Sequence, residues 1–168
     1  MNKIKFLIIS LLALFVFITL IGLLFPSKVR VSRLVEITAS PEKVKTYVFN
    51  IKYWKLWMEA AQTNNIKFYT LQTEGEGTVA EIDKSRITIT KQSLNELVTE
   101  WKTASGNKFT AIFQVQYQPN KNTTIVSWMF IQHVAWYPWE RIASLMSQKI
   151  LSPPMEKSLS TLKHVVEQ

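Results

Sequence analysis

Few side chains in this sequence have both the chemistry and the setting of a catalytic group. His133 ends an apolar, strand-like run, and Glu81 lies in another such run between Ala80 and Ile82. Each side chain exchanges protons and is a candidate general acid or base toward a substrate bound nearby. A lone histidine at a strand end is also a common structural residue, and a strand carboxylate commonly faces solvent. Catalysis by His133 or Glu81 is therefore one hypothesis among several.

The sequence lacks the other common catalytic and metal-binding patterns. It contains no cysteine, which excludes disulfides, thiolate catalysis and cysteine-bound zinc. Its two histidines, His133 and His164, belong to no cluster of His, Asp and Glu at metal-ligand spacing. There is no nucleophile elbow and no phosphate-binding glycine loop. We therefore expect neither a metal nor a cofactor.

Arg33 is the third residue whose chemistry stands out. It shares strand parity with Val31, Val35 and Ile37, so alternation points its side chain toward the core. A buried unpaired charge is costly, and Arg33 therefore needs a partner, a route to water or an anionic group on a ligand. Its position near the start of the strand favours a route to water, and Glu81 is a candidate partner. The sequence leaves these alternatives open.

Aromatic side chains indicate an apolar cavity more strongly than any polar group indicates catalysis. The chain has six tryptophans and nine phenylalanines, more than a small, tightly packed core needs. Apolar clefts lined by aromatic residues are the usual small-molecule sites. If the best-alternating strand faces point inward, the lining candidates are Trp101, Phe113, Val115, Tyr117, Trp128, Phe130 and Met146. Each of these side chains is equally compatible with an ordinary core.

The N-terminal part of the chain is too apolar for a globular domain. Residues 6–25 contain no charge, no proline and one glycine. Twenty residues of helix at about 1.5 Å per residue match the ~30 Å hydrocarbon core of a bilayer. A secretory signal has a shorter apolar run and a small-residue cleavage site, whereas this run ends in Leu24-Phe25-Pro26. We expect an uncleaved single-pass anchor within residues 1–27, with a cleaved signal as the alternative.

The distribution of basic residues gives little information on the membrane orientation of the domain and more on its binding partners. Basic residues lie on both sides of the apolar run, so the positive-inside rule hardly discriminates between the two orientations. A short basic tail before a first span usually stays cytoplasmic, and we expect domain 28–168 to face the periplasmic or extracellular side. This domain keeps 18 of the 20 basic residues against 12 acidic ones, a net charge of +6, which suits an anionic membrane surface or ligand. The basic residues are scattered singly, so no nucleic-acid partner is expected.

Hydrophobic periodicity predicts the elements that position these side chains. Residues 29–38 alternate as a half-buried strand, and Ser40 and Pro41 then suit the N-cap and first position of a short helix. β-branched and aromatic runs separated by turn residues follow, as in an antiparallel meander. The six strands predicted there cover residues 67–72, 78–83, 86–93, 97–103, 109–118 and 123–132.

The C-terminal part has helical periodicity in two consecutive segments. Residues 142–150 and 155–166 each present one apolar stripe. Pro153 and Pro154 lie between the stripes, and we expect the helix to kink or restart there, with Ser152 as a cap. Only this element is long enough to cover one face of the sheet. The expected fold is α+β: a curved seven-stranded antiparallel sheet wrapped around a long C-terminal helix, with two short helices after strand 1.

Three segments carry a resemblance to a known family. They are VSRLVEITASPEKVKTYV, NIKYWKLW and the tail ERIASLMSQKILSPPMEKSLSTLKHVVE. Together they resemble the START-like, or Bet v 1-like (SRPBCC), superfamily, specifically its bacterial polyketide cyclase/dehydrase and lipid-transport branch. The resemblance covers residues 29–167 and implies a helix-grip fold. Asn50 stands where the family has Asp, and Met58 and Glu59 stand where it has Pro after the second Trp.

The resemblance also implies a place for the aromatic stub and a set of functions. In such a fold Tyr53, Trp54 and Trp57 would plug one end of the space between sheet and helix, and Trp57 is also a candidate ligand contact. A membrane-tethered protein that binds a hydrophobic or lipid-like molecule is the first hypothesis. The alternatives are a cyclase/dehydratase-like enzyme and a regulatory or scaffolding module whose cavity is filled by its own side chains. Fold alone does not choose among them.

Overall fold

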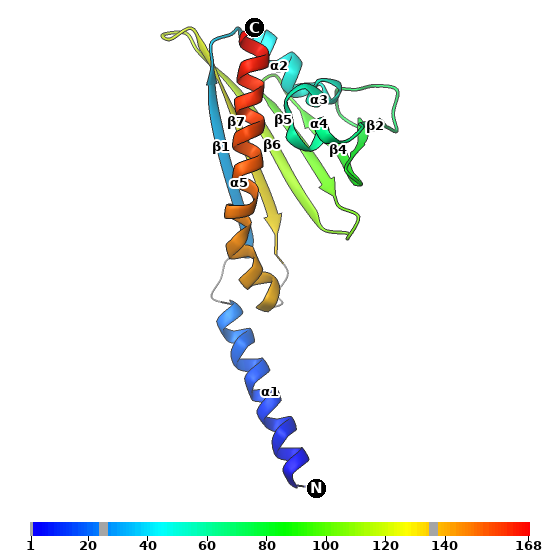
Figure 1. Cartoon of the computed structure of the whole chain (residues 1–168), viewed down its shortest axis with the longest axis vertical. Helices are drawn as coiled ribbons and strands as arrows, with labels where there is room; N and C mark the ends of the chain where they lie inside the picture. The colour runs from blue at the N-terminus through cyan, green and yellow to red at the C-terminus, as the bar shows by residue number, and fades with distance from the viewer. Residues whose placement is uncertain (1, 24–26, 135–137) are drawn as a thin grey trace.

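A sheet that packs on one long helix makes up the main body of the protein (Figure 1). The structure, a computed structural model, describes residues 2–23, 27–134 and 138–168. Its helices are α1 (Asn2–Leu23), α2 (Pro41–Phe49), the 3-10 turn η1 (Ile51–Tyr53), α3 (Trp54–Trp57), α4 (Glu59–Thr63) and α5 (Pro138–Glu167). Its strands are β1 (Lys28–Ile37), β2 (Lys67–Phe68), β3 (Val79–Ile82), β4 (Ser85–Gln92), β5 (Glu96–Lys102), β6 (Lys108–Gln118) and β7 (Thr123–His133).

The predicted seven-stranded antiparallel sheet is confirmed. The strand order is β1-β7-β6-β5-β4-β3-β2, so the first strand returns to pair with the last. β2 is much shorter than predicted. Its pairing with β3 ends at Phe68. A longer ladder would need the Val79 N–H for a backbone hydrogen bond, but this N–H donates to the Thr70 hydroxyl, 3.1 Å away. Gly75 and Gly77 then take positive φ angles in the connection to β3.

The short helices after β1 begin as predicted and bury the aromatic stub. Ser40 caps α2 by accepting the Lys43 N–H at 3.3 Å. Trp54 and Trp57 are fully buried, and their ring N–H groups donate to the backbone oxygens of Val48 and Tyr47, respectively. Paired ring nitrogens allow large indoles to fill the end of the core without the cost of an unsatisfied donor.

The long C-terminal helix does not restart at its prolines. Pro153 and Pro154 lie inside the continuous helix α5, and Ser152 accepts a hydrogen bond from Arg33 instead of capping a second segment. Each proline removes one backbone donor. Burial of the apolar stripe that follows compensates for that loss and holds the helix on the sheet. The buried residues of this stripe are Met155, Leu159, Leu162 and Val166.

The N-terminal helix stands apart from the core. Within α1 the segment Lys3–Gly22 is long and apolar enough to cross a membrane, and its side chains are exposed almost throughout. Length and composition alone do not distinguish a span from a signal sequence. Residues 24–26, on which the cleavage argument rests, lie outside the described residues. The boundary between an anchor (1–27) and a binding domain (28–168) stays a prediction.

Candidate functional site

An apolar cavity of about 310 Å³ lies between the sheet, α4 and α5. This volume is at the lower end of the range for small-molecule sites. The sheet supplies one wall from the ends of β5 and β7 and the start of β6, and the helices supply the other. The lining residues are Met58, Glu59, Ala60, Trp101, Thr103, Asn107, Phe109, Trp128, Phe130, Gln132, Leu151, Pro154, Met155 and Ser158.

Ring contacts hold the sheet wall of the cavity in place. Phe109 packs between two lining rings, with centroid distances of 4.2 Å to Phe130 and 5.6 Å to Trp101. Trp101 also stacks on the buried Trp54 at 6.0 Å. Aromatic pairs of this kind add about 0.5–1.5 kcal/mol each beyond the area they bury. The rings therefore form a firm apolar wall.

Trp128 has the one buried side-chain nitrogen or oxygen without a hydrogen-bond partner among the described residues. The other three tryptophans described above, Trp54, Trp57 and Trp101, all donate their ring N–H at 2.8 to 3.0 Å. An unsatisfied buried donor costs on the order of 1–3 kcal/mol. Trp128 also lines the cavity, but its ring nitrogen is inaccessible there, so an oxygen on a bound molecule would reach it only if the ring shifted.

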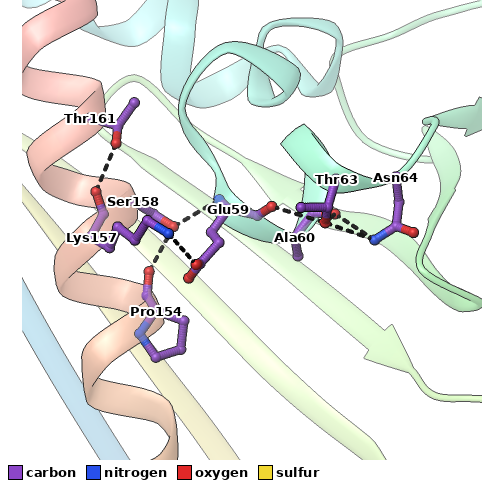
Figure 2. A network of polar contacts seen from close by, with 8 residues as sticks. All are labelled: Glu59, Ala60, Thr63, Asn64, Pro154, Lys157, Ser158 and Thr161. Atoms are coloured by element: carbon purple, nitrogen blue, oxygen red, sulfur yellow. Dashed lines mark hydrogen bonds and ion pairs between the residues drawn. The ribbon is translucent and has the colours of Figure 1, made fainter.

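A polar network fastens the helix wall of the cavity, as Figure 2 shows. The hydroxyl of Ser158 on α5 accepts the Glu59 N–H at 3.0 Å and donates to the backbone oxygen of Pro154 at 2.7 Å. Lys157 forms an ion pair with the Glu59 carboxylate at 2.6 Å. Since α4 has no side-chain cap of its own, Ser158 acts as its N-cap from another element.

Nine residues were predicted from the sequence to contact a ligand, and they fall into three groups. Trp101, Trp128 and Phe130 line the cavity. Trp57 and Phe113 are buried behind its wall, where Phe113 stacks on Trp128 at 5.1 Å and Trp57 packs edge-on against it at 6.1 Å, and Val115 is buried further along β6. The remaining three, Arg33, Tyr117 and Met146, lie outside the lining.

Tyr117 and Met146, two of the predicted ligand contacts, are not among the residues that line this cavity. Tyr117 has the inward parity, but it lies near the far end of β6, is 41% exposed and bonds Asn122. Met146, in the first half of α5, is 52% exposed. Strand parity and helical spacing predict which face a residue occupies, and they do not predict how far the covering element extends.

Arg33 and the two candidate catalytic groups also lie outside the cavity lining. Arg33 donates to Glu156 and Ser152 on α5, so its partner is not Glu81. Glu81 accepts a hydrogen bond from the Tyr69 hydroxyl at 2.9 Å. His133 is exposed at the end of β7 and borders a separate shallow depression. Glu59 is the one lining residue with an ionisable side chain among those described.

Several residues that line the cavity were not predicted from the sequence. Phe109 shares parity with Phe113, and Gln132 shares parity with Phe130, so strand alternation contained the signal for both. Met155 belongs to the apolar stripe of α5, which was predicted as core. Met58 and Leu151 depend on how the helices meet above the sheet, and local sequence carries no signal for that.

The cavity lies toward the end of the sheet nearest to α1. Lys28, which begins β1 soon after α1, pairs with His133 at the end of β7. Gln132 pairs with Phe109, and Phe109 pairs with Trp101. The strand ends that line the cavity therefore lie at the same end of the sheet as the start of β1, and that end points toward α1 in Figure 1.

Two carboxyl groups with perturbed ionisation lie away from the cavity. A hydrogen bond from the Thr123 hydroxyl and the nearby Lys121 ammonium lower the pKa of Glu36. Hydrogen bonds from Gln114 and Lys91 lower the pKa of Glu96. Within the described residues no group of His, Asp and Glu is arranged to hold a metal ion.

Comparisons with known proteins agree with this architecture. No protein-family model and no curated protein sequence matches the chain. A solved structure from Nitrosospira multiformis superposes with a TM-score of 0.65 at 12% identity, over 81% of this chain and 94% of that one. A START superfamily protein from Mycobacterium smegmatis gives 0.61 at 17% identity, over 83% and 97% of the two chains.

A third solved structure extends the comparison. The di-domain ARO/CYC protein BexL of the BE-7585A biosynthetic pathway gives a TM-score of 0.61 at 13% identity, over 84% of this chain and 51% of that one. At these identities the likeness concerns the fold. The seven-stranded sheet, the short helices after β1 and the gripped C-terminal helix show that the chain has the START-like, SRPBCC fold.

Proposed function

We propose that this protein is a membrane-tethered binding protein that holds a hydrophobic or amphipathic small molecule between its sheet and α5. The observation that carries the proposal is the cavity itself, with its aromatic wall and about 310 Å³ of space. The protein's own side chains leave the space beside this apolar wall open. An apolar ligand that fills the space buries apolar surface, which makes its binding favourable. A ligand with an acceptor oxygen would pair with the buried Trp128 N–H if the ring shifted to expose it.

The lipid-like nature of the ligand is supported by size and by place. A cavity of this volume accommodates a single chain or a small ring system better than a whole two-chain lipid. The long apolar helix α1 immediately precedes the domain, and with α1 in a bilayer the cavity would lie close to a supply of lipids. We propose that α1 is retained as the tether and that the domain faces the periplasmic or extracellular side.

Binding is favoured over catalysis by the polar groups at the site. BexL is an ARO/CYC protein by its description, but Glu59 is the only ionisable side chain among the described lining residues and it is paired with Lys157. The other polar side chains of the lining are Thr103, Asn107, Gln132 and Ser158. Such neutral groups bind and orient a ligand but are poor general acids and bases.

Native mass spectrometry of the full chain, released from detergent micelles, tests the proposal. We expect a co-purified small molecule, and we expect Leu151→Trp, which fills the cavity from α5, to lower its occupancy by at least tenfold. Ile150→Trp is the matched control, because Ile150 is the neighbouring residue, is 65% exposed and lies outside the lining. An empty wild-type protein that also fails to bind added fatty acids would refute the proposal.

A further inference from the structure

The end of the domain nearest to α1 carries a group of exposed cations. Lys28 and Arg30 lie at the start of β1, and Lys102 pairs with Lys108 where β5 meets β6. Lys149 lies in the first half of α5, which contacts α1. All five side chains are exposed. We name these residues the basic collar.

Among the described residues some basic side chains of the domain are held in ion pairs, and others, the collar cations and Lys43 and Lys52 among them, are not. The ion pairs among the described residues involve Arg33, Lys91, Lys121, Lys157 and Lys163. The collar cations form no ion pair in the described structure. Unpaired, fully hydrated cations remain available to an external anionic surface.

Acidic residues at this end do not cancel the collar. Of the acids on the collar's own elements, Glu100 and Glu140 border the same depression as Lys108, and these two leave the five cations with a net positive charge. The adjacent β3–β4 hairpin carries Lys84 and Arg86 against Glu81 and Asp83, so it adds no net charge.

Two collar residues are sequence neighbours of residues that line the cavity. Lys102 and Lys108 flank Thr103 and Asn107 of the lining in sequence. Exposed apolar side chains lie at the same end of the molecule, since Met146 is 52% exposed and Ile150 is 65% exposed on the first half of α5. Cations beside exposed apolar side chains are the composition of a surface that meets lipid headgroups.

We propose that the basic collar docks on the anionic surface of the bilayer that holds α1, so that the cavity mouth opens onto lipid headgroups. This inference rests on the proposed function in one respect, the retention of α1 as a membrane span. Charge complementarity and continuity with α1 select an anionic lipid surface as the partner. Each cation near such a surface strengthens docking by about fivefold, and salt weakens the attraction.

Hydrogen–deuterium exchange on the full chain in lipid nanodiscs tests the docking. One set of discs contains phosphatidylcholine alone, and the other contains phosphatidylcholine mixed with phosphatidylglycerol. We expect the backbone amides of residues 102–108 to exchange more slowly in the anionic discs. The turn at residues 119–122, at the other end of β6 and β7, should exchange equally in both.

Matched charge variants make the result specific. Lys102→Gln combined with Lys108→Gln should reduce the protection of residues 103–107 by about 20-fold or more, following the fivefold contribution of each cation. Lys43→Gln combined with Lys52→Gln removes the same charge from exposed positions in α2 and η1 and should leave the protection unchanged. Equal exchange in the two kinds of disc overturns the docking but leaves the binding function standing if a ligand still co-purifies. A mature protein that lacks α1 overturns the docking together with the tether of the proposed function.

Discussion

Arg33 on β1 and Glu156 on α5 form an ion pair across 123 residues of sequence, with 2.5 Å between Nε and Oε1. A second nitrogen of the same guanidinium donates to Ser152, one helical turn earlier. Because β1 is an edge strand of the sheet, this contact joins the first strand of the domain to its last helix. Arg33 therefore fastens the helix to the sheet beside its two prolines.

The Arg33–Glu156 pair should contribute modestly to stability and not to ligand binding. The two side chains are 27% and 59% exposed, and solvent screening limits such pairs to about 0.2–1 kcal/mol. A double-mutant cycle with Arg33→Gln and Glu156→Gln, measured by urea unfolding of the full chain, should give a coupling energy in that range. Ligand occupancy should match wild type in all three variants. Loss of the ligand from the Arg33→Gln protein would instead support the alternative that Arg33 binds an anionic group.

Trp128→Phe should cost less stability than Trp57→Phe, although both substitutions remove an indole N–H from a buried ring. Trp57 loses a hydrogen bond to the Tyr47 oxygen, whereas Trp128 has none to lose. The difference in the free energy of unfolding should be about 1 kcal/mol or more. Trp128→Phe should also lower the affinity for the co-purified ligand by roughly fivefold to tenfold if that ligand bonds the Trp128 nitrogen through an acceptor oxygen. Equal destabilisation with unchanged ligand occupancy would show that the Trp128 nitrogen plays no part in binding.

Ser158→Ala should loosen the wall that α4 provides to the cavity. The substitution removes the acceptor of the Glu59 N–H, and Ser158 is only 2% exposed, so water does not easily replace it. Loss of an N-cap costs about 1 kcal/mol. Thr161→Ala is the control, because its hydroxyl bonds a carbonyl on the exposed side of α5 and its loss should change stability by less than about 0.5 kcal/mol. Urea unfolding and amide exchange of residues 58–63 measure the two effects, and similar results for both variants would contradict the capping role.

Acid should weaken the contact between β1 and the β6–β7 turn. The folded state lowers the pKa of Glu36 through the Thr123 hydroxyl and Lys121. A carboxyl group with a lowered pKa stabilises the fold above its ordinary value of 4.5 and loses that contribution as the pH falls through 4.5 and below. Glu36→Gln and Thr123→Val should therefore each flatten the decline of Tm below pH 4.5, and the double variant should flatten it no further. Additive effects of the two substitutions would show that they do not act on one contact.

Most of the architecture could be predicted from the sequence because its signals are local. Alternation in β1, β6 and β7 and the Ser40-Pro41 helix start each depend on a few neighbouring residues. The end of β2 could not be predicted, since it depends on a hydrogen bond that the Val79 N–H donates to the Thr70 hydroxyl in place of a strand contact. The uninterrupted α5 could not be predicted either, since its stability across Pro153 and Pro154 comes from burial against a distant sheet.

The candidate site was less predictable than the fold because it depends on the offset between elements. Parity correctly assigned Trp101, Trp128 and Phe130 to the sheet face that lines the cavity. It could not show that Phe113, with the same parity, is sealed beneath Trp57 and Trp128. The contribution of α4 and of Leu151 follows from how α3, α4 and α5 pack over that face, which no short-range pattern encodes.

The short connection between α1 and β1 limits where this protein can act. α1 ends at Leu23 and β1 begins at Lys28, so five peptide steps join them, which span at most about 17 Å at ~3.4 Å each. With α1 in a bilayer, as proposed, the domain stays beside its own leaflet and cannot shuttle cargo across to a facing membrane. Any onward delivery then requires a soluble acceptor that comes to the domain and collects the molecule there.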